Sequence, residues 1–319
     1  MRIFLAGGTG AIGRRLIPFL RQSGHEVTAT TRSNGKLEVL RNLGAKPVLL
    51  DAFDRRSVEK AVIEAQSDVV MHQMTALANL KDFRKFESEL ALTNRLRTEG
   101  AEILLQAAQS AGAKRFIAQS YSGWPNERTG SRIKTESDPL DPNPPDAMKP
   151  TVKALIQLEQ MVTNAQALTG IVLRYGSFYG PGTGVAPDGI LVEALQSRQF
   201  PIIGSGTGIW SWVHIDDAAR ATVLALEYGE SGIYNIVDDE PAEVATWLPV
   251  LADAVKAKAP RRIPAWLGRL FIGEAGVSMM TRSRGSSNAK AKQALHWQPS
   301  YASWREGFHY GLTDRQPKV

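Results

Sequence analysis

The chain has 319 residues, of which 43% are hydrophobic and 22% are charged, and it contains no cysteine. This composition is that of a globular protein long enough for one large core, or for a core and a smaller lobe. The lack of cysteine excludes disulfides, thiolate nucleophiles and cysteine-ligated metals. The five histidines show no metal-ligand spacing, so no metal site is expected. The net charge of +6 comes from scattered basic residues without a basic helix, so we expect no nucleic-acid partner.

Membrane segments are also not expected. No run approaches the roughly 20 apolar residues that cross a bilayer, and the N-terminus leads directly into a predicted strand instead of a signal peptide. The sequence is therefore compatible with a cytoplasmic protein that has no membrane partner.

The N-terminal stretch 2–16 predicts a strand, a glycine-rich turn and a helix. An apolar run at 3–5 precedes the turn at 7–13, and apolar residues then recur at helical spacing until Ser23-Gly24. Glycines in such a turn let the backbone approach a pyrophosphate, and the following helix directs its N-terminal amides at that anion. The pattern favours a dinucleotide-binding loop, with an ordinary glycine turn as the alternative.

The following residues continue to alternate between strands and helices. Further strands are predicted at 26–31, 47–50, 68–72, 114–119 and 170–175, and helices at 55–66, 87–111 and 150–168. This alternation predicts an α/β protein with a Rossmann-type doubly wound parallel sheet. Ligands of such sheets bind beyond the carboxyl ends of the strands, so residues that follow each strand are the candidates for function.

The pattern changes in the second half of the chain. A long polar loop at 123–148, either a lid or a surface segment, precedes the last strand of the alternating region. A helix at 216–228 and a strand at 232–236 follow, and the chain is mostly helical beyond 240. We expect a dinucleotide-binding domain of residues 1–176 plus about 214–238. Residues 177–213 and 239–319 then form a smaller C-terminal substrate lobe.

Several motifs, taken in order, resemble the extended short-chain dehydrogenase/reductase superfamily, and within it the NAD-dependent epimerase/dehydratase proteins. They are the glycine loop 7–13, Asp51-Ala52-Phe53-Asp54, His72-Gln73-Met74-Thr75-Ala76, Leu173-Arg174-Tyr175-Gly176-Ser177-Phe178-Tyr179-Gly180, Trp212-Val213-His214-Ile215-Asp216-Asp217 and Gly232-Ile233-Tyr234-Asn235-Ile236. Each motif alone is weak, but their order is specific.

The resemblance implies a nicotinamide dinucleotide and a set of residues that bind it. The set comprises Gly7, Thr9, Gly10, Ala11, Ile12 and Gly13 at the pyrophosphate, Asp51 and Ala52 at the adenine, Gln73 and Met74 beside ribose and pyrophosphate, and Gly176, Ser177 and Phe178 along the nicotinamide. For Asp51 the alternative is a turn or capping carboxylate before the helix that starts at Arg55.

Arg32 stands at the end of the second predicted strand, where an acidic residue would bind the adenosine ribose and repel a 2′-phosphate. A guanidinium is instead suited to hold a phosphate through two hydrogen bonds. The sequence therefore predicts NADP in preference to NAD, unless Arg32 is only an exposed loop residue.

The catalytic pattern of the family is incomplete. The family places a tyrosine and a lysine four residues apart on the helix after the fifth strand, and a serine or threonine at the end of that strand. Lys153 matches the lysine, but Lys149 occupies the tyrosine position. Tyr121 occupies the serine or threonine position and is flanked by Ser120 and Ser122.

Three explanations remain open. Tyr121 can supply the missing phenol, with Lys153 on the ribose and Ser120 or Ser122 orienting a substrate oxygen. Lys149 can act instead if burial depresses its pKa. Alternatively, the protein has lost catalysis and is an NADP-binding sensor or regulator. We favour an oxidoreductase, epimerase or dehydratase-like enzyme with a small carbonyl or hydroxyl substrate. The resemblance also implies a possible homodimer through the helices at 87–111 and 150–168.

Overall fold

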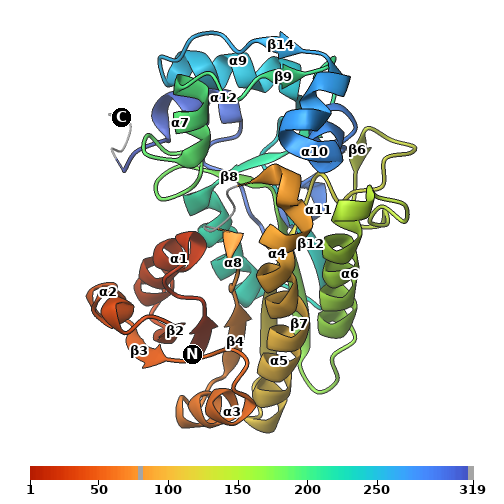
Figure 1. Ribbon diagram of the computed structural model, residues 1–319. Coiled ribbons are helices and arrows are strands. Elements are labelled where there is room, and N and C mark those ends of the chain that lie inside the picture. The colour runs from red at the N-terminus through yellow and green to blue at the C-terminus, as the bar shows by residue number, and fades with distance from the viewer. Residues whose placement is uncertain (78–81, 315–319) are drawn as a thin grey trace.

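The computed structural model describes residues 1–77 and 82–314 as an α/β protein with a larger sheet-containing lobe and a smaller, mostly helical one (Figure 1). Seven strands form the central sheet: β1 (Arg2–Ala6), β2 (Glu26–Thr31), β3 (Lys46–Leu49), β4 (Val69–His72), β5 (Arg115–Tyr121), β7 (Thr169–Tyr175) and β12 (Gly232–Ile236). Their spatial order is β12-β7-β5-β4-β1-β2-β3, and every neighbouring pair is parallel. The predicted doubly wound sheet is therefore confirmed, with the chain reversing direction across the sheet between β1 and β4.

The strands are buried runs of apolar and β-branched residues, as expected when both faces of a parallel sheet are covered. β2 and β12 have the predicted bounds. β5 is longer than predicted, because it continues through Ser120 to Tyr121, which pairs with Tyr175 of β7. Tyr121 is consequently the last residue of the strand and lies at the carboxyl edge of the sheet.

Helices cover both faces of the sheet. One core cluster packs α1 (Ala11–Gln22), α2 (Leu37–Asn42) and α8 (Ile215–Tyr228) against one face. A second core cluster packs α3 (Arg55–Glu64), α5 (Ala101–Ser110) and α6 (Lys149–Thr163) against the other. The two helical layers cover the faces of the sheet and leave the carboxyl ends of its strands open.

The single helix predicted at 87–111 is interrupted. It consists of α4 (Phe86–Arg95), a π-helical segment η4 (Leu96–Gly100) and α5, with the short 3₁₀ turn η3 (Phe83–Lys85) before it. π-Helical segments are rare and often occur at functional sites. The backbone carbonyl of Leu96 in this segment bonds the ring of His72, the last residue of β4, at 2.9 Å. The segment is thereby held at the carboxyl end of the sheet.

The remaining elements are short strands and helices, most of them in the smaller lobe. The strands are β6 (Ile133–Lys134), β8 (Ser177–Tyr179), β9 (Ile202–Ile203), β10 (Ile209–Trp210), β11 (Trp212–His214), β13 (Ala242–Glu243), β14 (Arg262–Ile263) and β15 (Gly285–Ser286). The helices are η1 (Asn34–Lys36), η5 (Asp146–Met148), α7 (Ile190–Gln196), α9 (Val244–Ala254), α10 (Ala265–Thr281), α11 (Ala289–Ala294) and α12 (Trp304–Tyr310). The predicted boundaries between the two lobes stay a prediction. Residues 315–319 of the predicted substrate lobe lie outside the described part of the chain.

The polar loop at 123–148 is ordered. Its strand β6 pairs with β15 near the other end of the chain, and Arg128 forms an ion pair with Asp141 across the loop. The buried ammonium of Lys134 lies near the carboxylates of Glu127 and Asp138. These contacts hold the loop as a wall beside the end of β5.

The described residues lack two features. None of their helices is long and apolar enough to cross a membrane. No group of three or more histidine, aspartate or glutamate side chains is placed there to hold a metal ion.

Candidate active site

The glycine loop connects β1 to α1, and two of its glycines are required by the protein itself. Gly7 has a φ of +96°, and a Cβ on it would lie 2.6 Å from the carbonyl oxygen of Gln73. A Cβ on Gly13 would lie 2.4 Å from the carbonyl oxygen of Gly7. Both positions exclude any side chain, because backbone atoms cannot move aside as flexible side chains do.

Gly10 differs from its neighbours. It is exposed, its φ of −71° suits any residue, and a Cβ would meet only the Gly7 oxygen at 3.4 Å. No side chain caps α1, and the first turn of α1 contains no acidic residue. The amide end of this helix is therefore available to an anion, and a glycine at its entrance leaves room for close approach. This geometry fits a pyrophosphate.

The other predicted residues of the loop support this arrangement. The Thr9 hydroxyl bonds Thr31 at 3.3 Å, which ties the loop to the end of β2. Ile12 is buried in the core, and Ala11 packs against that core.

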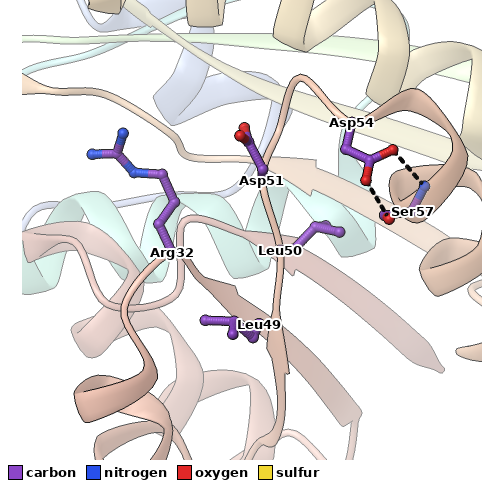
Figure 2. Close-up of a pocket in the computed structure, with 6 residues that line it drawn as sticks. All are labelled: Arg32, Leu49, Leu50, Asp51, Asp54 and Ser57. Carbon is purple, nitrogen blue, oxygen red and sulfur yellow. Dashed lines mark hydrogen bonds between the residues drawn. The ribbon is translucent and has the colours of Figure 1, made fainter.

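A pocket of about 370 Å³ lies at the ends of β2 and β3 and is lined by both Arg32 and Asp51 (Figure 2). The Arg32 side chain is exposed and extends into the same space as the Asp51 carboxylate. Asp51 accepts one hydrogen bond, at 3.0 Å from the amide of Phe53. The cap of α3 is instead Asp54, which accepts from the amide and hydroxyl of Ser57. Asp51 therefore makes the turn bond that the alternative interpretation allowed but does not cap α3, and its carboxylate retains capacity for a ligand.

The residues predicted beside the ribose lie along the glycine loop, but not all point toward it. Gln73 is buried, and its amide nitrogen donates to the Tyr175 hydroxyl at 3.3 Å, so only its backbone faces Gly7. Met74 is half-buried, whereas Ala52 is buried. A role of the Gln73 side chain toward the ribose therefore has no geometric support.

Tyr121 lies at the carboxyl end of β5 with its ring half-buried. Its Oη shares a hydrogen bond of 2.9 Å with Oγ of Ser177, at the start of β8. Burial raises the pKa of the Tyr121 phenol, although this bond and the charge of Arg97 act in the opposite direction. The phenol is thus held in its protonated form at neutral pH.

The two serines that flank Tyr121 have different surroundings from its phenol. Ser120 is 1% exposed and donates to the buried carboxylate of Glu159 at 2.7 Å, and Glu159 is also bonded by Arg174. Ser122 is equally buried and bonds the hydroxyl of Ser286. This geometry does not support the prediction that Ser120 or Ser122 orients a substrate oxygen, because both hydroxyls bond buried protein partners. Ser177 is the hydroxyl that meets Tyr121.

The two lysines of α6 are both exposed. Lys149 is the first residue of the helix, its side chain is 60% exposed, and it forms an ion pair with Asp146 at 2.6 Å. The proposal that burial makes Lys149 catalytic is therefore wrong. Lys153, one turn further along, is exposed, and its ammonium has no hydrogen-bond partner among the described residues, which leaves it available to a ligand.

The strand β8 brings the predicted nicotinamide residues to the end of the sheet. Gly176 packs against the backbone of Ser211, since a Cβ would lie 2.6 Å from its carbonyl oxygen. Ser177 and Phe178 are half-buried. Trp124 lies near Tyr121, with 6.0 Å between ring centroids, and adds an aromatic surface beside the phenol.

Arg97 is a buried residue of the site that sequence reasoning missed. It lies in η4, is 4% exposed, and its charge acts on the phenol of Tyr121. A charged residue inside an amphipathic helix normally indicates the solvent side. Leu90, Thr93, Arg97 and Gly100 nevertheless follow a spacing of three to four residues, and that spacing was the available signal.

The sheet order, the glycine loop and the position of the lysine on α6 together define a dinucleotide-binding protein of the extended short-chain dehydrogenase/reductase type. The sequence model of the NAD dependent epimerase/dehydratase family matches residues 3–237. The chain belongs to this family.

Two similar relatives are reductases by name. The chain is 40% identical over 308 residues to a 3-diazoavenalumate denitrifying reductase from a Streptomyces species, covering 96% of this chain and 99% of the relative. It is 30% identical over 263 residues to a 4-hydroxy-2-methyl-3-oxo-4-farnesyl-3,4-dihydroquinoline-1-oxide ketoreductase of Stigmatella aurantiaca, covering 81% of this chain and 75% of that one.

Solved structures share the fold. A UDP-glucose 4-epimerase of Thermus thermophilus in complex with NAD has a TM-score of 0.74 at 23% identity, and 98% of each chain is covered. A human epimerase family protein with NADPH has a TM-score of 0.73 at 20% identity, covering 98% of this chain and 99% of that one.

Proposed function

We propose that the protein is an NADP(H)-dependent reductase of a small carbonyl compound, in which Tyr121 provides the proton. The observation that carries this proposal is the Tyr121 phenol at the carboxyl edge of β5, bonded to Ser177, while the usual tyrosine position on α6 holds the exposed Lys149. The two named reductases among the relatives support reduction over epimerisation.

The described residues fit a nicotinamide dinucleotide. The open amide end of α1 at Gly10 suits the pyrophosphate, and the pocket between Arg32 and Asp51 suits the adenosine end. Similar folds are known with NAD and with NADPH. When bound, a reduced nicotinamide supplies a hydride. We assign its ribose to Lys153 and its ring to the surface of Ser177 and Phe178.

Tyr121 then holds the proton that completes the reduction. Its Oη donates the proton to the substrate oxygen as the carbonyl carbon is reduced, giving an alcohol. The resulting phenolate accepts a hydrogen bond from Oγ of Ser177, which is already in contact with it. The neighbouring guanidinium of Arg97 stabilises the same negative charge.

Replacing Arg32 by Ala is expected to weaken NADPH binding by about 10- to 100-fold and NADH binding by less than about threefold, because only NADPH carries the 2′-phosphate. Dissociation constants from quenching of tryptophan fluorescence measure both effects. Arg41→Met, which removes an exposed arginine of α2 paired with Glu38, is the control. Equal losses for the two cofactors would contradict a phosphate-specific role.

The pH dependence of kcat/KM tests the protonation state of Tyr121. The proton donor must be neutral, and burial raises its pKa above the ordinary value of 10. Activity that depends on this phenol is therefore fully present at neutral pH and is lost only as pH rises above about 10. We expect a flat profile from pH 7 to about 10. An alkaline limb below about pH 9 would show that another group controls the reaction.

Reductive removal of nitrogen from a diazo compound is a second candidate. It is favoured by the 40% identical relative, whose name describes such a reaction. In this reaction a hydride replaces N₂ on carbon, so there is no carbonyl oxygen to protonate. The absence of the usual tyrosine at position 149 is consistent with such a reaction. An aryl diazonium group then needs no proton, whereas a neutral diazo carbon needs one.

One experiment separates these activities and the non-catalytic alternative. Purified protein with NADPH is supplied with aldehydes, ketones or stabilised diazo carbonyl compounds, and the absorbance of the reduced nicotinamide is followed against enzyme-free controls. Oxidation of NADPH that depends on an added aldehyde or ketone is the expected result. Oxidation with diazo compounds alone would favour the second candidate, and tight NADPH binding without any oxidation would indicate a sensor. The homodimer through α4, α5 and α6 remains a proposal for solution measurements.

A further inference from the structure

The proposed proton transfer uses the positive charge of Arg97, but it does not explain why this buried side chain has no partner among the described residues. The residue is 4% exposed, and its Nε is sealed from solvent without a hydrogen-bond partner. Among the described residues, no carboxylate lies within ion-pair distance of this guanidinium. Among residues 1–77 and 82–314 its outer Nη atoms have no hydrogen-bond partner either, and the residue retains a small exposed surface.

The carboxylate whose charge acts on Arg97, that of Glu159, already has partners of its own. Glu159 is bonded at both oxygens by Arg174, at 2.7 and 2.6 Å, and one oxygen also accepts from Ser120. Its single negative charge is therefore matched by Arg174. Among the described residues, Arg97 is not half of an ion pair.

An unpaired buried cation is destabilising. Burial lowers the pKa of Arg97 to about 10, against the opposing influence of Tyr121 and Glu159. Desolvation of an ion is unfavourable unless an opposite charge compensates it. A buried charge without a partner is typical of sites where a ligand supplies the opposite charge. The η4 segment lies at the carboxyl end of the sheet, and the charge of Arg97 acts on the Tyr121 phenol there.

Resting on the reductase function proposed above, we propose that Arg97 binds a carboxylate of the substrate and thereby orients the reacting carbon beside Tyr121. The aromatic side chains near Tyr121 indicate the chemical nature of the rest of the substrate. Trp124 lies near the rings of both Tyr121 and Phe86, with ring centroids 6.0 and 5.4 Å away. Flat rings pack favourably on such a surface. The substrate class is a planar, unsaturated carboxylic acid.

Calorimetric titration with cinnamate and with its neutral analogue cinnamamide, in saturating NADP⁺, tests this assignment. The bound cofactor excludes its own phosphates as the ligand of Arg97. Wild-type protein is expected to bind cinnamate at least about tenfold more tightly than cinnamamide, because only the carboxylate forms a charge-assisted pair. Arg97→Met is expected to weaken cinnamate binding by about 10- to 100-fold and to leave cinnamamide binding unchanged.

Two further variants control the interpretation. Arg97→Lys keeps the positive charge and is expected to retain part of the preference for cinnamate. This variant also tests the proposal if Arg97→Met does not fold. Arg41→Met removes an exposed arginine and is expected to behave as wild type. The melting temperature of cofactor-free Arg97→Met is expected not to fall by more than about 2 °C, since an unpaired buried charge is lost.

Equal affinity of wild type for the two compounds, absence of cinnamate binding, or unaltered cinnamate binding in Arg97→Met would each overturn the proposal. These readouts do not depend on turnover. Carboxylate binding through Arg97 without NADPH oxidation would leave this inference standing and defeat the reductase function. Turnover of carbonyl compounds by wild type, together with cinnamate binding that is unaltered in Arg97→Met, would do the opposite.

Discussion

Tyr121→Phe is expected to lower kcat by about 10²- to 10⁴-fold, the contribution of a positioned proton donor. The change removes one hydroxyl from a half-buried ring and leaves its packing against Trp124 in place. NADPH affinity is expected to remain within about twofold of wild type, since no cofactor contact is assigned to the phenol. Loss of the bond to Ser177 is expected to cost about 1 kcal/mol in the free energy of unfolding.

The measurements are NADPH oxidation at saturating substrate, fluorescence titration with NADPH, and urea unfolding. Tyr228→Phe is the matched control, because that tyrosine lies at the end of α8 and is 51% exposed. Undiminished kcat in Tyr121→Phe would refute the role of Tyr121 as proton donor. With a diazo substrate the same result is the expected one if the reacting group is a diazonium ion.

Gly10→Ala is expected to weaken dinucleotide binding by about 10- to 100-fold while the protein still folds. The new methyl group meets protein only at 3.4 Å, from the oxygen of Gly7, so folding is little disturbed. It lies instead at the entrance to the amide end of α1, where a pyrophosphate must approach closely. Each tenfold loss corresponds to about 1.4 kcal/mol of binding free energy.

Two other glycines provide the comparison. Gly184→Ala, in the smaller lobe, makes an ordinary contact at 3.7 Å from Ile190 and is expected to bind NADPH as wild type does. Gly13→Ala forces a Cβ to within 2.4 Å of the Gly7 carbonyl and is expected to destabilise the whole fold by about 1 to 3 kcal/mol or more. Calorimetric melting and fluorescence titration separate the two effects. Wild-type NADPH affinity in Gly10→Ala would contradict the cofactor role of the loop.

The fold was accessible from the sequence because its signals are local. The continuous apolar runs in the strands, the period near 3.6 in the helices and the glycines between β1 and α1 are each properties of a few neighbouring residues. The capping geometry of α3 illustrates the limit of such signals. Asp51 and Asp54 both precede this helix, and only the structure shows that Asp54 bonds the amide of Ser57.

The chemistry at the end of β5 was only partly accessible. The sequence indicated that Tyr121 replaces a family serine and that Lys149 replaces the family tyrosine. Side chains on a strand alternate between faces, so adjacent residues meet different neighbours. Ser120 meets Glu159, 39 residues away, and Tyr121 meets Ser177, 56 residues away. No local pattern specifies such partners.

The sequence by itself therefore determined a doubly wound sheet with a dinucleotide loop, because steric constraints on glycine and hydrophobic periodicity are properties of neighbouring residues. Tertiary structure alone decided which polar groups meet and which stay without a partner. Arg97 is charged in the sequence like any exposed arginine, and its depth follows from the packing of η4 against α6 and the end of the sheet. Burial and charge pairing depend on segments distant in the chain, and they determine which residues can act on a substrate.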